Sequence, residues 1–129
     1  MKPFLQYLLF LIILSPLLSM GQNSTDYYYQ IPSYPSEYTS ETVAARLVDG
    51  LGFRFYWATA DLRPEDYAYK ASPEGRTLEE AVGHIMGLTH VLLNAVEDKP
   101  NTGGDRTQLK FEEKRAKALE NIQLASEIL

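Results

Sequence analysis

The sequence predicts an all-α fold of three long helices that form part of a four-helix bundle. Three stretches, residues 40–62, 77–97 and 107–129, repeat apolar side chains at spacings of three and four, the period of an α-helix with one buried face. No segment between them alternates polar and apolar residues as a strand does. The first stretch is apolar over more of its surface than a three-helix corner needs, so we expect a fourth helix that is absent or supplied by a partner.

The helix expected over residues 40–62 starts after a threonine and serine that can cap it. Its apolar stripe consists of Val43, Leu47, Leu51, Phe55, Ala58 and Leu62. Phe53 and Trp57 widen this stripe, so we expect the helix to touch two neighbours. Gly50 and Gly52 each cost roughly 1 kcal/mol of helix stability relative to alanine. They indicate either close approach of another helix or a wall beside a ligand.

The helix expected from Thr77 to about residue 97 carries both histidines of the chain. Thr77 and Glu80 form a capping box at its start, and Pro100 follows its end. Its stripe consists of Leu78, Ala81, Ile85, Leu88, Leu92 and Val96. At about 100° per residue, His84 falls at the edge of this stripe, and His90 falls roughly opposite its centre with the solvent-facing positions.

The helix expected from about Thr107 onward carries Phe111, Ala118, Ile122, Ala125 and Leu129 on its stripe, with the polar Arg115 among them. The apolar repeat of this helix continues up to Leu129, which favours a natural chain that extends further. The alternative is a helix that simply stops there. Between the first two helices, Pro64 and Pro73 mark a connection in which residues 64–67 are expected to form one helical turn.

The N-terminal residues have the pattern of a secretory signal peptide. A positive Lys2 precedes an almost wholly apolar run over residues 5–18, and small residues stand before a cut ahead of Gln22. The rival interpretation is a membrane anchor, but Pro16 favours cleavage. We therefore expect residues 1–21 to be a signal helix and the protein to be exported, periplasmic or extracellular, with no stable membrane span afterwards.

The mature chain then divides into two parts. Residues 22–40 are rich in tyrosine and proline and predict an extended arm, because prolines at this density forbid a helix. The arm either packs on the body through its tyrosines or forms an aromatic ligand surface. Residues 41–129 are expected to be the partial helical bundle.

Composition excludes several classes of function. The net charge is −5 and no block of lysine and arginine could neutralise a row of phosphates, so we expect no nucleic-acid partner. The chain has no cysteine, which excludes disulfides, thiolate metal sites and cysteine nucleophiles. No nucleophile elbow, phosphate loop or dinucleotide fingerprint is present, and no catalytic residue is identified.

Metal chemistry depends on His84. A metal site needs at least three converging ligands, and two on one helix must be three or four residues apart. His84 and His90 are six apart, about 120° round the helix, so they cannot bind one ion together. The available carboxylates are Asp49, Asp61, Glu80 and Glu97, but their spacing does not point at His84. From the residues alone, His84 is either a single ligand or a border histidine bonded to a neighbouring helix.

Two segments, VAARLVDGLGFRFYWATADL at 43–62 and EGRTLEEAVGHIMGL at 74–88, resemble the DinB-like superfamily, in particular exported members of Bacteroidetes-type bacteria. The resemblance implies a four-helix bundle with one long crossover. It also implies a divalent ion, often zinc or nickel, held by one histidine of the second helix and two of the last helix. His84 matches the first of these, and the sequence stops before the last helix would begin.

The resemblance therefore implies an exported DinB-like protein of the hydrolase or transferase type, truncated before its last helix, with a metal site that is incomplete in this chain. His84 would be its one ligand here, and this chain alone would not hold a zinc or nickel ion tightly. Trp57, Phe53 and Arg54 would line the approach. The alternative is a non-catalytic secreted module that binds a small apolar ligand or forms a homodimer through its apolar bundle face. The substrate is not specified by either interpretation.

Overall fold

A computed structural model describes residues 24–102 and 108–129, and the expected signal helix of residues 1–21 lies outside these ranges. The described residues form an all-α structure of three packed helices without strands. Its elements in chain order are η2 (Ser24–Tyr29), α2 (Ser40–Thr59), η3 (Pro64–Asp66), α3 (Leu78–Val96) and α4 (Phe111–Ile128).

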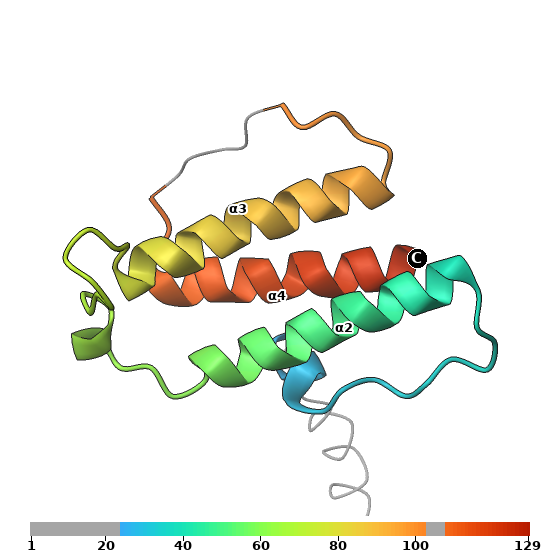
Figure 1. Cartoon of the computed structure of the whole chain (residues 1–129), viewed down its shortest axis with the longest axis horizontal. Helices are drawn as coiled ribbons and strands as arrows, with labels where there is room; N and C mark the ends of the chain where they lie inside the picture. The colour runs from blue at the N-terminus through green and yellow to red at the C-terminus, as the bar shows by residue number, and fades with distance from the viewer. Residues whose placement is uncertain (1–23, 103–107) are drawn as a thin grey trace, which may run out of the picture.

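The third long helix, α4, is the centre of the arrangement. Both α2 and α3 pack on α4 and have at most marginal contact with each other, while η2 packs on both α2 and α4. Figure 1 shows α4 between the other two helices, with α3 and α4 running in the same direction and α2 running the opposite way. The connection between α3 and α4 is therefore a crossover that returns the chain to its starting end.

The helix ends follow the capping residues closely. The predicted capping box at Thr77 is confirmed: Thr77 Oγ1 accepts from the Glu80 N–H at 3.1 Å, and a Glu80 carboxylate oxygen accepts from the Thr77 N–H at 2.7 Å. Thr39 caps α2 in the same way with Thr42. The expected turn after Pro64 is present as η3. Two boundaries were wrong, because α2 ends at Thr59 rather than 62 and α4 begins at Phe111 rather than 107.

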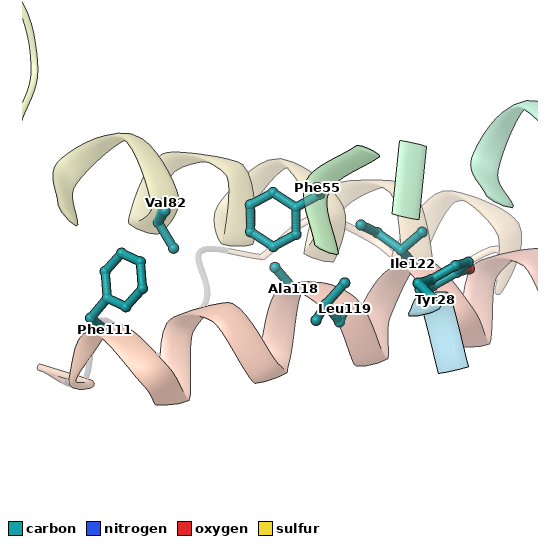
Figure 2. Close-up of a cluster of buried hydrophobic side chains, with 7 residues drawn as sticks. All are labelled: Tyr28, Phe55, Val82, Phe111, Ala118, Leu119 and Ile122. Carbon is teal, nitrogen blue, oxygen red and sulfur yellow. The ribbon is translucent and has the colours of Figure 1, made fainter. Parts of the chain in front are cut away.

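The core lies between α4 and the two helices that flank it. Figure 2 shows Phe55 of α2 above Ala118 and Leu119 of α4, and Val82 of α3 above Phe111 at the start of α4. The seven buried side chains of this cluster are Tyr28, Phe55, Val82, Phe111, Ala118, Leu119 and Ile122. Phe111 also stacks on Tyr67 with ring centroids 4.0 Å apart, so the connection after α2 closes this end of the core.

Arg115 joins α4 to the end of α2. Its Nε donates to Thr59 Oγ1 at 2.8 Å, its Nη2 donates to the Tyr56 carbonyl at 3.2 Å, and its guanidinium lies over the Tyr56 ring. Tyr56 belongs to the last turn of α2, where carbonyls have no partner within the helix and a positive charge is favoured. This contact explains why a charged residue occupies a position of the α4 stripe.

The contact between α3 and α4 uses a different face of α3 from the predicted one. Val82, Thr89 and Leu93 are buried there, and Asn121 of α4 donates to Thr89 Oγ1 at 3.3 Å. Leu88, which the stripe placed in the core, is 55% exposed. The apolar period missed this face because Thr89 is buried through its hydrogen bonds rather than through its hydropathy.

The segment before α2 lies against the bundle and inserts one side chain into it. Tyr28 of η2 is fully buried, and its ring occupies the space beside Gly52 of α2. A Cβ at position 52 would lie 2.4 Å from this ring, so no side chain fits there without displacing Tyr28. Close approach of another element is therefore the reason for Gly52, although the element is η2 rather than a long helix.

Gly52→Ala is expected to destabilise the protein, since overpacking a tight core costs about 1–3 kcal/mol and exceeds the gain in helix propensity of roughly 1 kcal/mol. Gly87→Ala is the matched control, because nothing lies within 4 Å of a Cβ at that position of α3. It should stabilise the protein by up to about 1 kcal/mol. Urea unfolding measures both free energies, and equal effects of the two substitutions would contradict the close packing of Tyr28.

Candidate functional site

His84, the predicted metal ligand, is an exposed residue of α3. Its side chain does not contact the core and forms no hydrogen bond with the described residues. The alternative prediction, a border histidine bonded to a neighbouring helix, is therefore not supported. His84 lies one turn before the exposed Leu88, at the margin of an apolar surface. An exposed imidazole in this position is open to a ligand from outside the bundle.

His90 was expected on the solvent side and is instead half-buried. Its Nε2 lies 3.3 Å from Asn94 Nδ2, and the same amide nitrogen donates to Asn101 Oδ1 at 2.9 Å. The two histidines therefore have the reverse of their expected exposures. The reason is the rotation of α3 described above, which turns His90 toward the connection to α4 and His84 away from it.

The carboxylates considered as further ligands do not gather at His84. Asp49 is buried on α2, Glu80 accepts from the Thr77 N–H, and Glu97 pairs with Lys99. Asp61 is exposed beyond the end of α2. Within residues 24–102 and 108–129, no three histidine, aspartate or glutamate side chains are placed to share a metal ion.

An apolar surface without a covering element runs along α2 and α3, and we call it the open face. It consists of Val43, Leu47 and Leu51 of α2 and Ile85, Leu88 and Leu92 of α3. Leu47 is 72% exposed, the highest value among these leucines. The open face therefore contains the parts of the predicted stripes that α4 does not bury.

The two halves of the open face turn toward the same side of α4. On α2, the opposite flank carries Asp49, which is bonded to Tyr28 of η2 and Ser126 of α4. On α3, the opposite flank carries Glu79, bonded to Lys114 of α4, and Asn94, bonded to the α3–α4 connection. The remaining flanks, with Leu51 and Leu88, are exposed and are not covered by any element of the described residues.

A second arrangement joins three elements through one buried carboxylate. Asp49 Oδ1 accepts from the Tyr28 hydroxyl at 3.2 Å and from the Ser126 hydroxyl at 2.6 Å. These residues belong to η2, α2 and α4, and they lie far apart in the sequence. The sequence offered Asp49 only as a possible metal ligand, although it is the single carboxylate inside the otherwise uncharged run from Leu47 to Phe53. Because Asp49 accepts from both hydroxyls, the arrangement locks the three elements together.

The charge of Asp49 also acts on the tyrosine. Burial raises the pKa of the Tyr28 hydroxyl well above its ordinary value, and the nearby Asp49 carboxylate raises it further. The hydroxyl is therefore held in its neutral form, which is the form that donates to Asp49.

Comparison with family models, with curated proteins and with solved structures found no match to this chain. Among the described helices, none combines the length and the hydropathy needed to cross a bilayer.

Tyr28 predicts how stability changes at high pH. An unfolded tyrosine loses its proton near pH 10, whereas folded Tyr28 keeps it, so stability falls as the pH rises above about 10 by up to roughly 1.4 kcal/mol per pH unit for this group. Tyr28→Phe should have a shallower loss of stability above pH 10, measured by urea unfolding at several pH values. Tyr38→Phe, at an exposed tyrosine, is the matched control and should keep the wild-type slope. Identical slopes in all three proteins would contradict the buried contact.

Proposed function

We propose that this chain is an exported helical-bundle module whose open face binds one further α-helix. The observation that carries the proposal is the open face itself, a double row of leucine, isoleucine and valine, interrupted on α2 by Arg54, on two helices that scarcely touch each other. A helix laid across α2 and α3 would meet both rows and complete a four-helix arrangement around the existing core. An apolar surface of this kind on a small protein marks an interaction site.

The proposed bundle is of the DinB-like type. Its support is the resemblance of residues 43–62 and 74–88, together with the crossover that links the parallel helices α3 and α4. Export is supported by the signal-peptide pattern of residues 1–21. The covering helix would come from a continuation of the natural chain or from a partner.

The metal part of the proposal concerns the completed bundle. Within the described residues His84 has no second ligand nearby, so they do not suit a zinc or nickel site by themselves. His84 lies at the margin of the open face, where a covering helix would bring its own side chains. In the completed protein His84 would be one ligand, and we derive no catalytic step from it.

A second candidate function is self-association of a non-catalytic module. It is favoured by the exposure of Leu47 and Leu88, since a second copy can cover the same surface in the absence of another helix. Both candidates use the open face, and they differ in what covers it. The coding sequence beyond Leu129 separates them: an amphipathic helix with two histidines at spacing four supports the completed metal site, and a continuation without histidine removes it.

The open face predicts the association state of residues 22–129. The wild-type protein should associate with rising concentration, and Leu47→Glu or Leu88→Glu should weaken association by at least roughly tenfold, about 1.4 kcal/mol. Sedimentation velocity over a range of concentrations measures the constant.

Leu124→Glu is the matched control, because it makes the same change at an exposed leucine of α4 nearly opposite Ser126 round the helix. It should leave association unchanged. A wild-type protein that stays monomeric and binds no apolar dye would overturn the proposal.

His84 predicts the metal affinity. Binding of zinc or nickel by residues 22–129 should be weak and should depend on His84. His84→Ala should therefore lower the affinity by at least about tenfold. His90→Ala is the control, and it should bind as the wild type does. Calorimetric titration with each metal measures both, and equal binding by wild type and His84→Ala would end the role of this histidine.

A further inference from the structure

A row of exposed side chains, most of them aromatic, lies along the N-terminal arm and the flank of α2 that the arm contacts. We call it the aromatic collar; it consists of Tyr29, Ile31, Tyr34, Tyr38 and Trp57. Tyr34 and Tyr38 are 73% and 75% exposed, and Trp57 is 45% exposed. The fold uses Tyr28 from this region for its core, whereas the collar residues are left on the surface.

The collar is held in place rather than free. Trp57 Nε1 donates to the Tyr29 carbonyl at 3.3 Å, and the two rings lie 5.1 Å apart between centroids. Arg46 donates to the Pro32 carbonyl, and its guanidinium lies 4.3 Å from the centre of the Tyr34 ring. These contacts fix the arm along α2 and present a surface whose rings lose little freedom on binding.

A positive charge lies within the collar. Arg46 of α2 donates to the Pro32 carbonyl and forms no ion pair within the described residues. The carboxylates of Glu37 and Glu41 lie at the end of the collar where α2 begins. Tyrosine, tryptophan and arginine together are the side chains that settle at the headgroup level of a bilayer, where one end of each is apolar and the other is wet.

The position of the collar along the chain supports the same partner. The apolar run of the sequence ends at Leu18, and η2 begins at Ser24. The stretch between them reaches at most about 20 Å at 3.3–3.6 Å per residue. While the apolar run is in a bilayer, during export or for as long as it is retained, η2 and the collar next to it are therefore kept close to the membrane surface.

We propose that the aromatic collar docks on the headgroup region of a phospholipid bilayer, with Trp57 and the tyrosines at the interface and Arg46 toward lipid phosphates. This is peripheral contact and requires no spanning segment of the bundle. It uses the arm and Trp57 rather than the side chains of the open face, so it stands or falls independently of the proposed function.

Trp57 is the only tryptophan of the chain and is therefore a built-in reporter. The experiment uses the full chain, residues 1–129, in phosphatidylcholine nanodiscs with and without lipids brominated near the headgroup. Trp57 emission should shift to the blue relative to detergent and lose at least half its intensity with brominated lipid. Tyr34→Ala combined with Tyr38→Ala should reduce that quenching at least twofold, while Leu88→Glu, on α3, should leave it unchanged.

A protein carrying Trp57→Phe and Leu124→Trp moves the reporter to α4, on the side away from α2. Its emission should be unaffected by brominated lipid, and circular dichroism confirms that each variant is folded. Absence of quenching at Trp57 would overturn the proposal, and so would equal quenching at both positions. A Trp57 response to a soluble oligosaccharide, without one to lipid, would show a carbohydrate platform instead and would also overturn it.

Discussion

The structure depends on one constraint, which is that α4 packs against two helices at once. Its residues Ala118, Ile122 and Ala125 are fully buried between α2 and α3. The two alanines leave room for the flanking helices to approach closely, and Ile122 fills the space between them. Because α2 and α3 each bury one face against α4 and bury little surface against one another, each keeps an exposed apolar surface. The open face is the direct consequence of this shared packing.

The sequence predicted the three long helices well, but it missed η2 within the arm that was expected to be extended, and it predicted the helix faces poorly. Helix number, the capping box at Thr77 and the turn after Pro64 all follow from local signals, and the structure confirms them. The faces depend on buried polar pairs that an apolar period ignores. Thr89 is buried because Asn121 bonds to it, and Thr59 because Arg115 does. Removing one member of such a pair would leave its partner unsatisfied, so these residues fix the rotation of a helix as firmly as a leucine does.

The candidate site likewise combines a position that the sequence predicted with contacts that it did not predict. Periodicity placed His84 at the edge of an apolar stripe, and that stripe proves to be the uncovered one rather than the core. The buried carboxylate of Asp49 was beyond prediction, because its two donors come from opposite ends of the described chain. Tyr28 itself gave no local signal, since it stands between two tyrosines that stay near the surface. Such residues are distinguished only by what the fold brings beside them.

The contact that joins Tyr28, Asp49 and Ser126 also orders the events of folding. The cavity for Tyr28 is complete only when the last turn of α4 has packed, so the earliest part of the bundle to be synthesised is the last to gain its partners. During synthesis from the N-terminus, η2 consequently stays undocked until α4 is complete. Closing a loop of this length is slow and entropically costly. The same segment that is packed in the finished protein is therefore the one open to proteases until α4 has packed.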